Sequence, residues 1–111
     1  MDIDVSEIGQ VTVVTPQADI DMAAADTVKR RLFELVDQGR IQLVVDLTHV
    51  RYIDSSGLGA LVAALKHARS ARGDVKICAM QNDVRAIFEM TLLTKVLSIH
   101  ASRQEAVASW G

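Results

Sequence analysis

Residues 52–61 (YIDSSGLGAL) constrain this chain more than any other stretch, because here an extended segment changes into a helix through polar residues and glycines. Residues 41–47 (IQLVVDL) are apolar and rich in β-branched side chains, which is typical of a buried strand. Leu58, Leu61 and Leu65 then recur at helical spacing. The Asp-Ser-Ser-Gly sequence therefore lies at the positive end of a helix, where free backbone N–H groups favour negative charge.

The first third of the chain predicts a hairpin followed by a helix. Residues 3–8 and 11–15 are short extended runs, and the Gly-Gln pair between them is suited to a two-residue turn. Residues 22–38 carry apolar side chains on one side and charged side chains on the other, which indicates an amphipathic helix. Gly39 is expected to end it.

The last third predicts two more strands and two more helices. Residues 74–79 form an apolar run, and Asn82 is expected to cap the helix that follows. A short extended piece at 96–99 leads to Ser102 and Glu105, which have the spacing of a capping box. The order is therefore β-β-α-β-α-β-α-β-α.

This order predicts an α/β fold with a mixed sheet of four to five strands. The hairpin comes first, and the later strands are joined by helical crossovers, which makes them parallel. We expect the helices mainly on one face, because 111 residues leave few to spare for two full helical layers. We expect residues 1–111 to form a single domain.

Composition excludes several classes of protein. The net charge of −2 provides no basic surface for a nucleic-acid backbone, so direct nucleic-acid binding is not expected. Cys78 is the only cysteine, which rules out an intramolecular disulfide and favours a reducing, cytoplasmic setting. The longest uncharged apolar run, residues 57–65, is far shorter than a membrane span. We therefore expect no membrane insertion.

Catalytic and nucleotide-binding interpretations of the central motif are weaker. A serine hydrolase using Ser55 or Ser56 would need a histidine base and an oxyanion hole, and the local string differs from the Gly-x-Ser-x-Gly elbow. Gly57 and Gly59 suggest a phosphate cradle, but the third glycine of a dinucleotide site and the Gly-Lys-Ser/Thr of a P-loop are missing. Nucleotide binding stays an alternative.

Metal binding has little support, and we predict no metal and no cofactor. The three histidines are scattered, and no Cys-His spacing is present. Asp19, Asp21 and Asp54 would converge on a divalent ion if their bends lay side by side. Capping of helix N-termini by Asp21 and Asp54 explains these residues at least as well. We interpret Met22, Met80 and Met90 as packing residues rather than a cofactor site.

The motif at residues 53–59 (IDSSGLG) resembles that of the STAS domain of bacterial anti-sigma factor antagonists. The likeness spans nearly the whole chain. Three further segments resemble the family: residues 44–47, 20–29 and 85–96. The family often has glycine where this chain has Ala18 and Leu92.

This resemblance implies a partner-switching protein rather than an enzyme. In such systems the unphosphorylated antagonist binds an anti-sigma factor, a serine kinase of the histidine-kinase ATPase fold, and the sigma factor is released. The kinase can phosphorylate the antagonist with ATP, and a PP2C-type phosphatase removes the phosphate. Independently of the resemblance, the composition predicts no nucleic-acid and no membrane partner, and no motif indicates a cofactor.

The resemblance also implies which residues act. The phosphoacceptor is the serine directly after the aspartate, Ser55, with Ser56 as a secondary site. The predicted partner surface comprises Asp19, Asp21, Asp54, Ser55, Ser56, Gly57 and Leu58. We expect it to continue along the exposed side of the second helix, with the small side chains of Ala60, Ala63 and Ala64.

Two other functions stay open. STAS-like domains also serve as accessory subunits of membrane transporters, and co-purification with a transporter would favour that role. A small nucleotide-binding module using Ser55 is the second alternative, and it would bind nucleotide without any partner.

Overall fold

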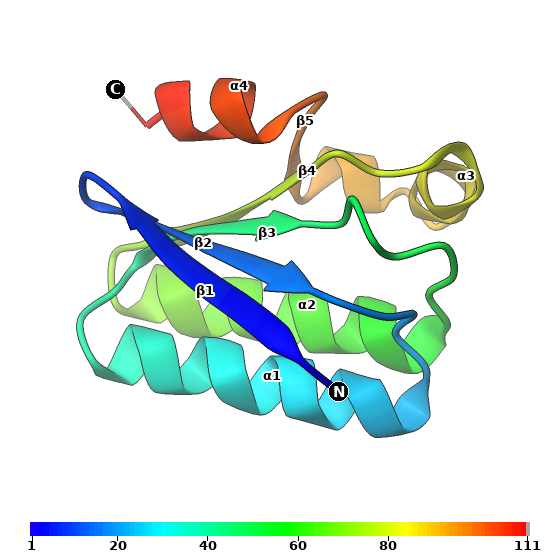
Figure 1. The fold of residues 1–111 in the computed structure, drawn as a ribbon, viewed down its shortest axis with the longest axis horizontal. Helices are drawn as coiled ribbons and strands as arrows, with labels where there is room; N and C mark the ends of the chain where they lie inside the picture. Colours follow the sequence, from blue (N-terminus) through cyan, green and yellow to red (C-terminus); the bar gives the residue numbers. More distant parts are fainter. Residues whose placement is uncertain (111) are drawn as a thin grey trace.

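The computed structural model describes residues 1–110, in which five strands form one sheet with helices on both faces (Figure 1). Residue 111, the last of the expected 1–111 domain, lies outside the described residues. The strands are β1 (Ile3–Ile8), β2 (Val11–Pro16), β3 (Gln42–Asp46), β4 (Asp74–Cys78) and β5 (Ser98–His100). The helices are α1 (Met22–Asp37), α2 (Ser55–Ser70), α3 (Asn82–Met90), the 3-10 helix η1 (Leu93–Lys95) and α4 (Arg103–Ala108).

The sheet has the predicted mixed topology. Its order is β1-β2-β3-β4-β5, with β1 antiparallel to β2 and all other neighbours parallel. Ile8 pairs with Val11 across a two-residue turn, where Gly9 has a φ of 62° that glycine adopts without steric cost. The N-terminal hairpin and the parallel crossovers are therefore confirmed.

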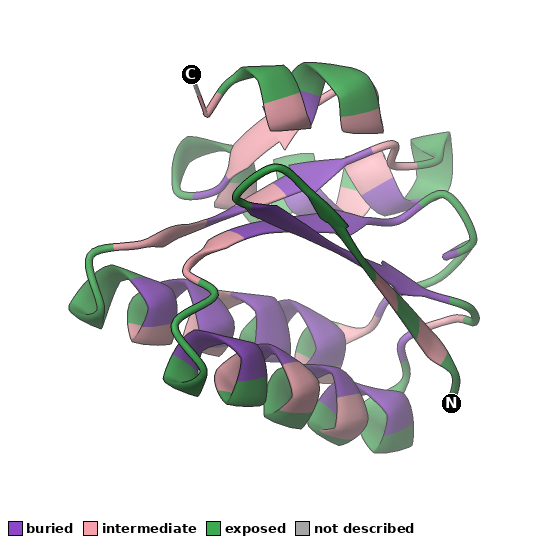
Figure 2. Ribbon diagram, turned by 60° about the vertical axis from the view of Figure 1, so that its left-hand side comes forward, coloured by how far each residue is buried: buried purple, intermediate pink, exposed green. Residues whose placement is uncertain are grey.

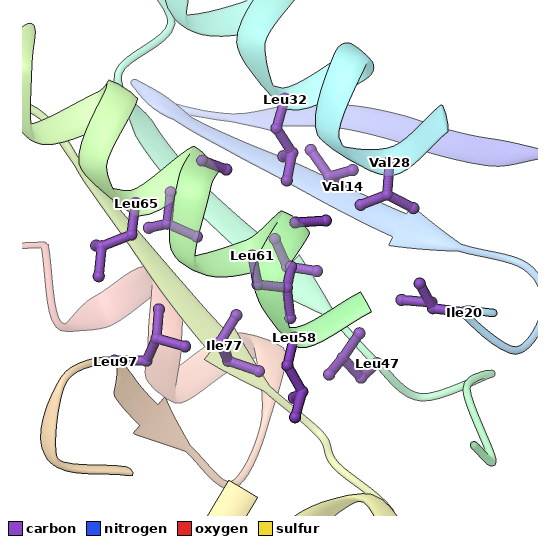
Figure 3. Packing of buried hydrophobic residues seen from close by; sticks show 14 of the residues in the cluster. Val14, Ile20, Val28, Leu32, Leu47, Leu58, Leu61, Leu65, Ile77 and Leu97 are labelled. Atoms are coloured by element: carbon purple, nitrogen blue, oxygen red, sulfur yellow. The ribbon is translucent and has the colours of Figure 1, made fainter. Parts of the chain in front are cut away.

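Helices α1 and α2 lie side by side and cover one face of the sheet (Figures 1 and 2). Leu32 of α1, Leu61 and Leu65 of α2 and Ile77 of β4 are fully or almost fully buried in the main core between these layers (Figure 3). Burying such a side chain contributes about 1.5–3 kcal/mol. The apolar sides of both helices are therefore buried against this one face of the sheet.

The six-residue helix α4 lies over the other face (Figure 1). It covers a smaller apolar cluster: Val11, Val13, Val44, Cys78 and Ala106. Strands β2 and β3 are consequently buried on both faces, which explains their almost continuous apolar sequences (Figure 2). The prediction that helices cover mainly one face holds, because among residues 1–110 only this short helix covers the second face.

Two predicted helix caps had different outcomes. Asn82 is the first residue of α3 rather than its cap, and the cap position belongs to Gln81. The Gln81 side chain makes no cap bond and instead donates from Nε2 to the Thr48 carbonyl, 2.9 Å away. Ser102 does cap α4, accepting a hydrogen bond from the backbone N–H of Glu105 at 3.1 Å.

No helix within residues 1–110 combines the length and apolar character needed to cross a bilayer.

Candidate functional site

Ser55 is exposed and is the first residue of α2. The helix begins here because Asp54 has an extended backbone, with φ −100° and ψ −176°, and its Oδ1 accepts a hydrogen bond from the Gly57 N–H at 3.0 Å. Ser56 is half-buried. The predicted acceptor hydroxyl is therefore presented to solvent at the positive end of a 16-residue helix.

Asp21 performs the same task for α1. Its backbone is extended, and its Oδ1 accepts a hydrogen bond from the Ala24 N–H at 2.9 Å. The first residues of α1 and α2 lie at the same end of the molecule (Figure 1). Helix capping by Asp21 and Asp54, one of the two interpretations of these carboxylates, is what the structure shows.

Asp19 connects the two segments that precede these helices. Its Oδ1 accepts hydrogen bonds from the backbone N–H groups of Arg51, at 2.7 Å, and Tyr52, at 3.2 Å. Next to it, Ile20 forms an isolated parallel bridge with Ile53. The bends before α1 and α2 therefore do lie side by side.

This proximity does not produce a metal site. Asp19, Asp21 and Asp54 each use Oδ1 to accept backbone N–H groups. Among residues 1–110, no group of three His, Cys, Asp or Glu side chains has an arrangement that could hold a metal ion.

Gly57 and Leu58 lie beneath the surface around Ser55, where they determine how closely α2 packs. A Cβ on Gly57 would lie 2.5 Å from Cγ1 of Ile53 and 3.0 Å from the Ile20 carbonyl oxygen, so only glycine lets α2 approach both bends. Leu58 is 8% exposed and belongs to the main core. Both residues are buried in this structure and position the surface around Ser55, and their contact with a partner stays a prediction.

Fewer residues of α2 are exposed on its outer side than the sequence predicts. Ala60 and Ala64 are buried, so the expectation that they lie on the exposed side is wrong; the helical repeat turns them toward the core with Leu61. Ala63 is half-buried, and Gly59 is exposed with nothing within 4 Å of an added Cβ. A groove between α1 and α2 is lined by Met22, Ala25, Asp26, Lys29, Ser56, Gly59, Ala60 and Ala63.

Two exposed apolar side chains flank the start of α2, and the sequence interpretation missed both. Met22 is 74% exposed at the start of α1, so the prediction that it is a packing residue is wrong, and Tyr52 is 52% exposed in the loop before Ser55. No local pattern separates Met22 from a packing residue, because it lies three residues before the buried Ala25, at helical spacing.

Comparison with known proteins agrees with this geometry. Residues 2–106 match the family model described as the STAS domain. An anti-sigma-B factor antagonist of Listeria monocytogenes is 33% identical over 81 residues, covering 73% of this chain and 71% of that protein. The anti-sigma-B factor antagonist of Bacillus subtilis is 27% identical over 107 residues, covering 96% and 97%.

A solved structure shares the whole fold. The crystal structure of an anti-sigma factor antagonist from Mycobacterium paratuberculosis superposes with a TM-score of 0.88 at 24% identity, covering 97% of this chain and 92% of that one. The expected fold class, a mixed sheet of the STAS type, is therefore confirmed.

Proposed function

This chain belongs to the STAS domain family, and on that premise we propose that it is an anti-sigma factor antagonist switched by phosphorylation of Ser55. The observation that carries the proposal is the exposed Ser55 hydroxyl at the N-terminus of α2, directly after the capping Asp54. The unphosphorylated form binds an anti-sigma serine kinase of the histidine-kinase ATPase fold and releases the sigma factor. Phosphorylation ends that binding, and a PP2C-type phosphatase restores it.

The position of Ser55 lets the fold tolerate a phosphate. Phosphorylation adds a charge of about −1.5 to −2 and three strong hydrogen-bond acceptors. An anion at an exposed helix N-terminus is stabilised by about 0.3–1 kcal/mol. Because Ser55 is exposed at the start of α2, the phosphate replaces water rather than a buried contact. We expect the modified protein to stay folded.

The same position makes the phosphate incompatible with docking. Asp54 is held next to Ser55 by its bond to the Gly57 N–H, so the phosphate would stand beside a fixed carboxylate. A partner covering Ser55 would have to remove water from both charges, and like charges brought together in an interface cost several kcal/mol. A loss of about 4 kcal/mol weakens binding about a thousandfold.

The surface around Ser55 supports protein docking. Met22 and Tyr52 offer exposed apolar area, and the groove between α1 and α2 is lined by the small residues Gly59 and Ala63. Exposed Met and Tyr side chains are enriched in protein interfaces. Asp21 is exposed beside this surface and stays a candidate partner contact.

The curated relatives described above are named as antagonists, which supports this role over the transporter subunit and the nucleotide-binding module. We propose that residues 1–111 act as one STAS domain in the cytoplasm. In this role the chain is the substrate of the kinase and performs no catalysis itself.

A pull-down from extract of the native cell tests the proposal. Unmodified protein should capture an ATPase of the histidine-kinase fold, and Ser55→Asp should not. Ser6→Asp is the matched control, because Ser6 is an exposed serine of β1, and it should capture the kinase normally.

With ATP, the captured kinase should add one phosphate to Ser55 and leave the melting temperature of the protein nearly unchanged. Full capture by Ser55→Asp, or no modification of Ser55, would refute the proposal.

A further inference from the structure

One oxygen of Asp19 holds two consecutive amides of the loop that carries the acceptor. The N–H groups of Arg51 and Tyr52 both point at Oδ1, at 2.7 and 3.2 Å, although the aspartate is 32 and 33 residues away in the chain. Hydrogen bonds to a charged acceptor are about twice as strong as neutral ones. Asp19 therefore fixes the backbone of this loop directly.

Backbone hydrogen bonds continue this contact up to the residue before Ser55. The Ile20 N–H donates to the Tyr52 carbonyl at 3.0 Å, and the Asp54 N–H donates to the Ile20 carbonyl at 3.2 Å. Ile20 and Ile53 are both buried, so this part of the loop is also anchored by the core. The acceptor thus follows a segment whose geometry is set by the turn before α1.

Arg51 and Tyr52 lack such an apolar anchor. Both are exposed, and they lie between the buried residues Val50 and Ile53. The carboxylate of Asp19 is the side chain that accepts both of their N–H groups. Without it, these amides would turn to water and the exposed part of the loop would gain conformational freedom.

We propose that Asp19 is a positioning residue for phosphorylation of Ser55, acting through the Arg51 and Tyr52 amides rather than by contact with the kinase. The inference rests on the proposed function. In the transfer, the Ser55 Oγ forms a bond to the γ-phosphorus of ATP, the bond from that phosphorus to the ADP oxygen breaks, and the hydroxyl proton passes to a base of the kinase. Misplacing a reacting atom by about 1 Å can cost about a hundredfold in rate.

Two substitutions at Asp19 separate positioning from charge. Asp19→Asn keeps an oxygen that can accept both N–H groups but removes the negative charge, whereas Asp19→Ala removes the acceptor as well. We expect Asp19→Ala to lower kcat/KM for phosphorylation of Ser55 by the captured kinase about tenfold or more. Asp19→Asn should stay close to the parent. Glu34→Ala, which removes an exposed carboxylate of α1 outside the groove, is the control for charge alone and should have no effect.

The exchange rates of the loop amides, measured without the kinase, test the same inference independently. Hydrogen exchange followed by NMR should show faster exchange of the Arg51 and Tyr52 amides in Asp19→Ala and parent-like exchange in Asp19→Asn. Unchanged exchange and phosphorylation in Asp19→Ala would overturn the inference while leaving the proposed function intact. Equal loss of phosphorylation in both variants would overturn it in favour of direct contact between the charge and the kinase. If the kinase leaves the parent unmodified, the proposed function and this inference fail together.

Discussion

The Nε of Arg103 lies 2.9 Å from Oδ2 of Asp46, and this ion pair joins the first turn of α4 to the end of β3. The Asp46 side chain is 5% exposed, and its Oδ1 also accepts hydrogen bonds from the hydroxyl and the N–H of Thr48. The Arg103 guanidinium donates a further bond to the Thr15 hydroxyl at 3.0 Å. A largely buried carboxylate therefore fastens the helix to the second face of the sheet.

Removing the guanidinium should destabilise the protein. Arg103→Met leaves the Asp46 carboxylate buried without its cation, and we expect the free energy of unfolding to fall by about 2–3 kcal/mol in urea titrations. Arg31→Met is the control, because Arg31 pairs with Glu34 at 3.4 Å on the surface of α1, where such pairs contribute less than about 1 kcal/mol. If the two substitutions lowered the free energy of unfolding equally, burial of the Asp46–Arg103 pair would contribute nothing to stability.

The same carboxylate should make stability depend on acid pH. Burial alone would raise the pKa of Asp46, but hydrogen bonds from Thr48 and the charge of Arg103 outweigh it and hold the pKa below its ordinary value of 3.8. As the pH falls, Asp46 therefore becomes protonated in the unfolded chain at a higher pH than in the folded protein. The stabilisation is complete above about pH 4 and is lost as the pH falls through the lowered folded-state pKa.

Asp46→Asn should show this directly. In denaturant titrations between about pH 6 and about pH 2, the parent should lose stability more steeply below about pH 4 than the variant does. Parallel curves for the two proteins would mean that Asp46 does not titrate with a lowered pKa.

Cys78 should report whether α4 stays docked. Burial, together with the nearby charge of Asp46, raises the pKa of the Cys78 thiol to about 12, although Arg103 opposes this rise. The thiol is fully buried, in one cluster with Ala106 of α4. We expect the native protein to react very slowly with a thiol reagent at about pH 8, and Arg103→Met to react faster. Rapid labelling of the parent would contradict this packing.

The two glycines of the central motif should respond in opposite directions. Gly57→Ala forces a Cβ to 2.5 Å from the Ile53 side chain and should destabilise the fold by about 1–3 kcal/mol. Gly59→Ala meets nothing within 4 Å and should raise stability by up to about 1 kcal/mol, because alanine favours a helix. Thermal melts measure both. If Gly59 lies in the partner interface, Gly59→Ala should also capture less kinase in the pull-down despite its higher stability.

Leu92 occupies a backbone conformation that suits glycine. Its φ of 61° is left-handed, which costs a residue with a Cβ about 1–2 kcal/mol, and its side chain is 59% exposed. Leu92→Gly should therefore raise the melting temperature slightly, since the relief exceeds the entropy that glycine adds to the unfolded chain. Ala71→Gly, at an ordinary φ of −98°, should lower it. A drop in both variants would mean that the Leu92 side chain makes stabilising contacts.

Local sequence was sufficient for much of the fold and of the site. The alternation of apolar residues, the Gly-Gln turn and the Ser102 cap predicted elements that the structure contains, because each depends on neighbours within a few residues. The placement of Ser55 at the start of a helix followed from the same reasoning, as did capping by Asp21 and Asp54. These features depend on hydrogen bonds that close within one helical turn.

Only the tertiary structure decided how those parts act on one another. The contact of Asp19 with the Arg51 and Tyr52 amides spans 32 and 33 residues, and that of Asp46 with Arg103 spans 57. Such contacts depend on which segments the sheet topology brings together, and no local pattern encodes that. The burial of a residue depends in the same way on what packs against its helix face. The sequence alone therefore determined the second helix and the place of Ser55 at its start, while the packing of distant segments determined what holds the loop before that serine in place.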